Sequence, residues 1–248
     1  MEKFLILAGR RSGTTFLASS LDSHAEIECT KEIFSTRRRF RYFQVDKSGS
    51  SFYKFRSTAF KRQLDYIFRR EQLIASFLTE IFAPCDTVKA KGIRLSYEQA
   101  HKYPEVLQWA LENDVRVIHL IRENSLKAIV SHFTAQKRGV HHVTSNVERV
   151  TVRVSPTKLK KLLIKRNNDI EKYRQMFKKP QYCEVCYETF VKNRQAESRR
   201  IFEFLQIDQF MALTSNLVKQ NPDSLKDILE NYEEVSRAFK GTAFEKYL

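Results

Sequence analysis

Short apolar runs alternate with longer segments of helical period along most of the chain. Strands are predicted for the apolar runs at residues 4–8, 88–95, 115–121 and 182–187. Helices are predicted at residues 14–23, 58–83, 103–114, 124–137, 157–178 and 196–207. Because strand and helix follow each other in turn, the pattern predicts a three-layer α/β fold, with a central parallel sheet covered by helices on both faces.

One segment, residues 35–62, departs from this alternation. It is dense in arginine, lysine and aromatic residues and has weak periodicity. We interpret it as an excursion from the sheet within a single domain that covers residues 1–248. It is either a solvated basic surface or a wall of a substrate site that faces an anionic molecule, and the composition leaves both readings open.

The turn after the first apolar run carries candidate chemistry. Residues 9–15 read Gly-Arg-Arg-Ser-Gly-Thr-Thr and end at the predicted helix start. Backbone N–H groups at a helix start lack intrahelical partners and bind anions, so the turn is a phosphate-binding candidate, although a plain helix cap would show similar residues. Three residues rather than four separate Gly9 from Gly13, and Thr14 stands where a nucleoside triphosphate motif has lysine.

The composition narrows the possible partners. The 248 residues carry a net charge of +15 and have a pI near 9.7, which favours an acidic ligand, a nucleic acid or an anionic surface. The four cysteines have no disulfide-framework or zinc-site spacing, so reduced thiols and no metal are expected. The sequence enters its first strand at once and has no apolar stretch of membrane-spanning length, which predicts a cytoplasmic protein without a signal or transmembrane segment.

A second basic position follows the strand predicted at 115–121. Arg122 leaves this strand, and Ser131 lies nine residues later on the next predicted helix. An arginine and a hydroxyl at this spacing could hold a second phosphate, although an arginine before an amphipathic helix is also common.

Together, the two segments resemble the sulfotransferases that use 3′-phosphoadenosine 5′-phosphosulfate. In that family a loop of the type [K/R]-[S/T]-G-[T/S]-[T/S] holds the 5′-phosphosulfate, and residues 11–15 match it. An arginine at a later strand end, with a serine eight or nine residues on, holds the 3′-phosphate, as Arg122 and Ser131 would. Arg11, in place of the lysine of cytosolic members, resembles the protein-tyrosine, carbohydrate and many bacterial enzymes. The resemblance implies that the donor is held by the following residues of the turn: Arg10, Arg11, Ser12, Gly13, Thr14 and Thr15.

Further segments resemble the same family and imply roles for single residues. Phe16 stands where cytosolic members stack a tryptophan on adenine, and Tyr187 matches a tyrosine near the adenine. Residues 230–248 resemble the end of bacterial lipopolysaccharide and nodulation-factor type enzymes, where Lys240 and Gly241 match a basic-Gly element that closes over the 3′-phosphate. Arg94 occupies the place of a lysine that ends a strand in those relatives, which makes it a substrate-site candidate.

The catalytic base implied by the resemblance is Glu32. Residues 21–32 resemble the segment after the first helix in protein-tyrosine and bacterial enzymes, which ends in an acid used as base. Cytosolic members use a histidine instead, so His24 stays an alternative, and His141 and His142 are candidates for the border of the acceptor site.

The implied function is transfer of a sulfonate group from this donor to an acceptor hydroxyl, without a metal. Arg11 would stabilise the charge that develops during in-line transfer. The resemblance favours a saccharide or glycolipid acceptor, and the basic segment favours one that is itself acidic. A P-loop kinase or NTPase and a basic nucleic-acid-binding protein are the alternative classes, and the oligomeric state cannot be read from the sequence.

Overall fold

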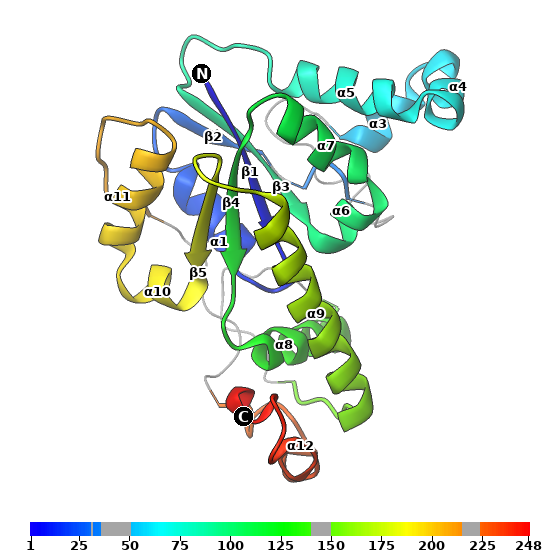
Figure 1. Cartoon of the computed structure of the whole chain (residues 1–248), viewed down its shortest axis with the longest axis vertical. Coiled ribbons are helices and arrows are strands. Elements are labelled where there is room, and N and C mark those ends of the chain that lie inside the picture. Colours follow the sequence, from blue (N-terminus) through cyan, green and yellow to red (C-terminus); the bar gives the residue numbers. More distant parts are fainter. Residues whose placement is uncertain (31, 36–50, 140–149, 215–223) are drawn as a thin grey trace.

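A computed structural model describes residues 1–30, 32–35, 51–139, 150–214 and 224–248 (Figure 1). The strands are β1 (Glu2–Ala8), β2 (Ile27–Cys29), β3 (Ala90–Ser96), β4 (Arg116–Ile121) and β5 (Tyr182–Cys186). The helices are α1 (Thr14–Leu21), α3 (Phe52–Ser57), α4 (Phe60–Phe68), α5 (Arg70–Ile81), α6 (Tyr97–Lys102), α7 (Pro104–Glu112), α8 (Ser125–Arg138), α9 (Pro156–Met176), α10 (Tyr187–Lys192), α11 (Arg194–Phe204) and α12 (Tyr232–Phe239).

The five strands form one sheet in the order β2-β3-β1-β4-β5, and every neighbouring pair is parallel. β1 lies in the middle, where Phe4 pairs with Gly92 of β3 on one side and with Arg116 of β4 on the other. The predicted α/β fold with a parallel sheet is therefore confirmed. Loops that leave β1, β3 and β4 meet at the carboxyl edge, the usual ligand site of such sheets.

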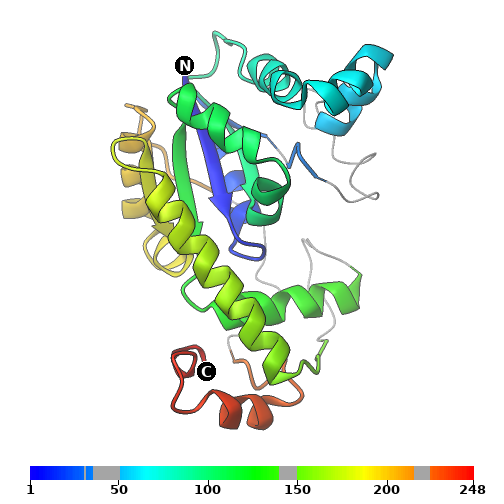
Figure 2. The ribbon, with the colours of Figure 1, turned by 45° about the vertical axis from the view of Figure 1, so that its right-hand side comes forward.

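Helices cover both faces of the sheet, as the alternation of strands and helices predicts. Leu5 and Leu7 of β1 point to one face, which packs on α5, α7 and α9, while Phe4 and Ile6 point to the other, which packs on α1 and α11. A third apolar cluster joins α8, α9 and α12 beyond the carboxyl edge, in the lower part of Figures 1 and 2. The carboxyl edge is thus flanked by packed helices, which hold the loops there in place.

Several elements differ from the pattern. The helix predicted at 58–83 is divided into α4 and α5 because the backbone at Arg69, with φ −141° and ψ 45°, leaves the helical region. Pro104 begins α7 and separates it from α6, since proline at a first helical position has no N–H to continue the preceding helix. The short strand β2 and the helices α3, α6, α10 and α12 were not predicted.

Candidate functional site

The turn between β1 and α1 leaves the start of the helix without a side-chain cap. Gly13, with φ 91°, is the N-cap of α1 and offers no side chain, and the first turn of α1 contains no acid. A Cβ at Gly13 would lie 2.4 Å from the ring of Tyr187, so the position needs glycine for space as well as for its backbone angle. The N–H groups at the start of α1 are therefore accessible to an anion.

Arg11 takes a conformation that is unusual for arginine. Its φ of 61° lies in the left-handed region, which costs a residue with a Cβ about 1–2 kcal/mol. In this conformation its Nε donates to Ser131 Oγ of α8 at 3.1 Å, and its carbonyl accepts from Arg122 Nη1 at 3.1 Å. The contact joins residues 120 positions apart, and it unites the two segments that the sequence singles out as phosphate sites.

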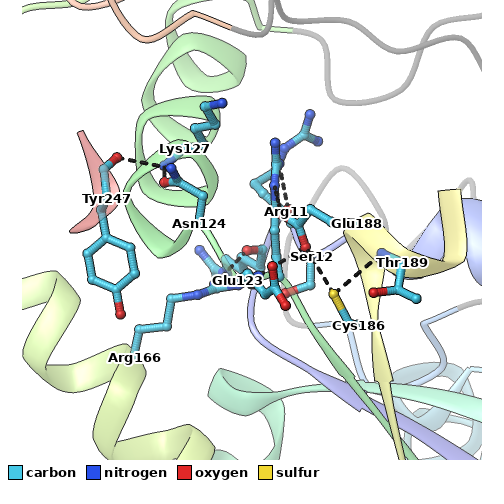
Figure 3. Close-up of polar contacts among 12 residues, drawn as sticks. Arg11, Ser12, Glu123, Asn124, Lys127, Arg166, Cys186, Glu188, Thr189 and Tyr247 are labelled. Carbon is cyan, nitrogen blue, oxygen red and sulfur yellow. Dashed lines mark hydrogen bonds and ion pairs between the residues drawn. The ribbon is translucent and has the colours of Figure 1, made fainter. Parts of the chain in front are cut away.

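Arg122 lies between this turn and α10. Its guanidinium carbon is 5.4 Å from the centre of the Tyr187 ring, and its Nε is 3.8 Å from a carboxylate oxygen of Glu188. That Nε is buried and has no hydrogen-bond partner in the part of the chain that the structure describes. Glu188 also accepts from the Glu123 N–H and from Cys186 Sγ (Figure 3). Glu188 and Tyr187 thus hold Arg122 at the carboxyl edge.

A buried arginine that the sequence analysis did not single out, Arg166, holds the turn between β1 and α1 through two hydrogen bonds. Arg166 of α9 donates to the Arg10 carbonyl at 3.0 Å and to Ser12 Oγ at 2.6 Å, and Figure 3 shows it pointing at the turn. Burial lowers the pKa of its guanidinium from the ordinary value. The signal was present: Arg166 falls on the apolar helical period of Leu159, Leu163, Ile170 and Tyr173, where a charged residue is unexpected.

Arg166→Met is expected to lower the free energy of unfolding by about 2 to 4 kcal/mol, because it leaves the Arg10 carbonyl and the buried Ser12 hydroxyl without this donor and removes a buried charged side chain. Urea unfolding followed by circular dichroism measures this change. Lys165→Met is the matched control, since Lys165 is the exposed neighbour on the same helix and its loss should change stability by less than about 0.5 kcal/mol. Equal stability of the two variants would contradict a bracing role for Arg166.

A cavity of about 190 Å³ opens beside the turn and collects residues from four segments. It is lined by Ala8, Gly9, Arg10, Arg11, Gly13, Thr14, Thr15, Glu32, Ser35, Arg94, Leu95, Ser96, Glu98, Gln99, Lys102, Arg122 and His132. The two residues proposed from sequence for catalysis, Arg11 and Glu32, therefore face the same space.

Glu32 is held there by its neighbours in the chain. The Thr30 N–H donates to the Gly92 carbonyl of β3 at 2.8 Å, and Ile33 and Phe34 are buried in the core. The Ser35 N–H donates back to the Glu32 carbonyl at 3.1 Å. Glu32 thus lies in a turn that is anchored on both sides, with its half-buried side chain in the cavity wall.

Arg94 comes from the end of β3 and is also buried. It donates to Thr15 Oγ1 at 3.2 Å and to the Thr30 carbonyl at 3.3 Å. These bonds tie the start of α1 to the segment that carries Glu32. Arg94 lines the cavity, as a substrate-site residue should, and it also has this bracing role.

The remaining predicted donor residues are more dispersed. Phe16 lies edge-on to Tyr187, with ring centres 6.4 Å apart, and Arg10 pairs with Glu98 at 3.1 Å. Lys240 is exposed, and the Gly241 N–H donates to Glu245 at 2.8 Å. Neither Lys240 nor Gly241 is among the residues that line the cavities around Arg122.

The C-terminal segment instead contributes later residues. Lys246 and Tyr247 line a second cavity of about 640 Å³, together with Arg122 and Tyr187. The Tyr247 carbonyl accepts from Asn124 Nδ2 at 3.0 Å, which fixes the segment to the start of α8 (Figure 3). The sequence prediction placed Lys240 and Gly241 of this segment at the donor, whereas Lys246 and Tyr247 are the residues of the segment that line the cavity.

The histidines differ in their surroundings. His24 is buried, lies 2.8 Å from the Gln209 carbonyl and packs on Phe202, which is a structural environment. His132 lines the cavity with Arg11, whereas His141 and His142 lie outside the described residues. His119 is buried within hydrogen-bond distance of two tyrosine hydroxyls, Tyr97 at 2.6 Å and Tyr182 at 2.7 Å, and burial lowers its pKa to about 4, so it is neutral at pH 7.

Comparison with known proteins gives one family. The family model described as "Sulfotransferase family" matches residues 4–211, which is most of the chain. No curated protein matches the chain. None of the helices in the described ranges is both long enough and apolar enough to cross a membrane.

Solved structures share the fold at low identity. A sulfotransferase domain from the Synechococcus PCC 7002 olefin synthase aligns with a TM-score of 0.52 and 14% identity over 97% of this chain and 88% of its own. A sulfotransferase from Alicyclobacillus acidocaldarius gives a TM-score of 0.50 and 15% identity, covering 90% of this chain and 87% of its own. Mouse sulfotransferase SULT7A1, crystallised with PAP, aligns with a TM-score of 0.50 and 14% identity over 84% of this chain. The alignment covers 59% of the mouse chain.

Proposed function

The chain belongs to the sulfotransferase family, whose enzymes use 3′-phosphoadenosine 5′-phosphosulfate, and we propose that it transfers the sulfonate group of this donor to an acceptor hydroxyl with Glu32 as the base. One observation carries the proposal: Glu32, Arg11 and Arg122 line one cavity at the open N-terminus of α1. An acid that can take a proton thus shares a space with donors that can hold a phosphosulfate.

The residues at the carboxyl edge fit a nucleotide with two anionic ends. The start of α1 has no side-chain cap and no acid in its first turn, and the cation Arg122 lines both cavities at this edge. Arg11 and the turn would hold the 5′-phosphosulfate, while Arg122 and Ser131 would hold the 3′-phosphate. When bound, the donor supplies a sulfonate group attached to a phosphate leaving group.

The chain's own groups would act by position and charge. The guanidinium of Arg11 remains charged and can offer two donors to adjacent oxygens, which stabilises negative charge that develops on the leaving phosphate. Glu32 would accept the proton of the acceptor hydroxyl as the oxygen attacks in line. Arg166 and Arg94 would keep the turn in shape through their bonds to Ser12 and Thr15.

We propose a saccharide or glycolipid as the acceptor, as in the bacterial carbohydrate enzymes of the family. The polar lining of the cavity supports this, because Ser35 and Lys102 border the space around Glu32, next to the Ser96 and Gln99 cap of α6. Labelled sulfate transferred into a fractionated cell extract tests the proposal. Label in saccharide or glycolipid fractions is expected, and label confined to protein tyrosine would contradict it.

The donor itself is tested by ligand-induced thermal stabilisation. Adenosine 3′,5′-bisphosphate should raise the melting temperature, because a ligand that binds only the folded state stabilises it. ATP with Mg²⁺ should have little effect, since Thr14 stands in place of the lysine of a triphosphate loop. Stabilisation by ATP-Mg²⁺ alone would favour a kinase or NTPase.

Arg122→Ala is expected to weaken binding of adenosine 3′,5′-bisphosphate by about 1.5 to 3 kcal/mol, the scale of hydrogen bonds to a charged group. Binding of adenosine 5′-phosphate, which lacks the 3′-phosphate, should change little. Isothermal titration calorimetry with both nucleotides measures the difference. If both lose affinity equally, Arg122 has a structural role and does not read the 3′-phosphate.

A further inference from the structure

The helix α4 exposes its apolar side to solvent. Phe60, Leu64, Ile67 and Phe68 are 75%, 40%, 70% and 78% exposed. Their spacing of four, three and one residues places them on one face of the helix, which we call the apolar stripe of α4. No residue of α4 is buried, although its neighbour α5 buries Leu73, Ile74 and Phe77 in the core.

Contacts on the opposite side of α4 fix this orientation. Arg62 donates to the Phe55 carbonyl at 3.2 Å and to Thr58 Oγ1 at 3.0 Å, and its guanidinium lies 3.8 Å from the centre of the Phe55 ring. Tyr66 packs against the core and has the Arg56 guanidinium 4.3 Å from its ring centre. The polar side of the helix therefore faces the protein, and the apolar stripe must face outward.

Cations surround the stripe. Residues 51–70 contain six lysines and arginines and one acid, Asp65. Lys61 and Arg69, which adjoin Phe60 and Phe68 in the chain, are exposed, and so is Lys54 of the neighbouring helix α3. In Figures 1 and 2 α4 lies at the tip of the arm formed by α3, α4 and α5, away from the sheet, where nothing else of the described chain covers it.

We propose that α4 docks the protein on a membrane surface that contains anionic lipids. An apolar stripe with aromatic side chains, flanked by cations, matches the acyl boundary and the charged headgroups of such a surface. A second copy of the chain is a poorer occupant, because each copy has a net charge of +15 and the same local excess of cations around the stripe. The proposal does not depend on the proposed reaction.

Docking would also serve the reaction. Arg56 and Tyr53 of α3 line a small cavity with Ser35 and Lys102, and both Ser35 and Lys102 also line the cavity of Glu32. The arm that carries the apolar stripe is thus continuous with the acceptor side of the candidate site. An acceptor anchored in the membrane would be presented near that side.

Sedimentation of the full chain with lipid vesicles tests the proposal. Phosphatidylcholine vesicles with about 30% phosphatidylglycerol should bind the protein at least about 10-fold more tightly than pure phosphatidylcholine vesicles. Ile67→Ser/Phe68→Ser should weaken binding to the anionic vesicles about 10-fold or more, since it removes most of the stripe's insertable surface. Lys61→Gln/Arg69→Gln should weaken it as well and reduce its dependence on salt.

The matched control is Val191→Ser/Ile164→Ser, which removes two apolar residues of 46% and 44% exposure on other helices. It should bind like the wild-type chain, and all variants should unfold at the same urea concentration as wild type. If the Ile67/Phe68 variant binds as tightly as the control, the stripe does not insert and the proposal is wrong. If the wild-type chain does not bind anionic vesicles and instead forms a dimer through these residues in analytical ultracentrifugation, the stripe docks on a second copy of the chain and the membrane proposal is wrong.

Discussion

Glu32→Gln is expected to lower kcat for sulfonate transfer about 100-fold or more, with little change in nucleotide affinity or melting temperature. Glutamine keeps the shape and most hydrogen bonding of the side chain but cannot take a proton from the acceptor. The turn that holds Glu32 depends on Thr30, Ile33 and Phe34 rather than on the carboxylate, so the fold should survive the change. Steady-state kinetics and nucleotide titration on the same preparation give both quantities.

The control for this variant is Glu28→Gln. Glu28 lies four residues earlier on β2, pairs with Lys91 at 3.5 Å and does not line the cavity, so its kcat should stay within a few-fold of wild type. His132→Gln is the decisive companion, because His132 also lines the cavity. A normal kcat for Glu32→Gln together with an inactive His132→Gln would move the role of base to the histidine.

Arg11→Ala is expected to lower kcat about 100- to 1,000-fold and also to weaken donor binding. The guanidinium would contact the bound donor as well as the transition state, so both quantities should fall, in contrast to Glu32→Gln. The variant also loses the bond to Ser131 Oγ, which joins the turn to α8. Single-turnover kinetics separates the loss in chemistry from the loss in binding.

Arg11→Lys distinguishes charge from shape. Lysine keeps the charge, and the resemblance assigns lysine to this place in cytosolic members, so it should recover part of the activity that alanine loses. The single ammonium group of lysine cannot bind Ser131 and an anion at once, as the planar guanidinium of arginine can, so the recovery of activity should be incomplete. Arg153→Ala, which removes an exposed arginine paired with Glu234, should have no effect on turnover. Full activity of Arg11→Ala would exclude Arg11 from the reaction.

The fold could be predicted from sequence where burial imposes a clear period. Strands such as β1 and β4 are buried on both faces and appear as continuous apolar runs. Period and burial disagree in α4, where Phe60, Leu64, Ile67 and Phe68 have a helical period and yet face solvent. Periodicity shows that one side of a helix is apolar, and it does not show where that side points.

The candidate site was predictable where the residues are local in the chain. The turn at 9–15 and the pair of Arg122 and Ser131 each follow a strand, and the structure joins them through Arg11. Arg166 stands out as a charge on an apolar helical period, but neither it nor Tyr247 could be assigned to this edge, because each reaches it from a distant helix or segment. The sequence contains their side chains but not the packing of α9 and the C-terminal segment that brings them to the carboxyl edge.

The central place of β1 has a consequence for how the protein is made. Phe4 pairs with Gly92 and with Arg116, so β1 obtains its two neighbours only after residues 90–121 have been synthesised. Contacts between residues so far apart in sequence form slowly, and until then an apolar strand with both edges open is exposed to aggregation. The hydrogen bond that Ser12 Oγ accepts from Arg166 forms later still, because Arg166 is synthesised after β4. The turn between β1 and α1 is therefore completed only after α9 has been synthesised.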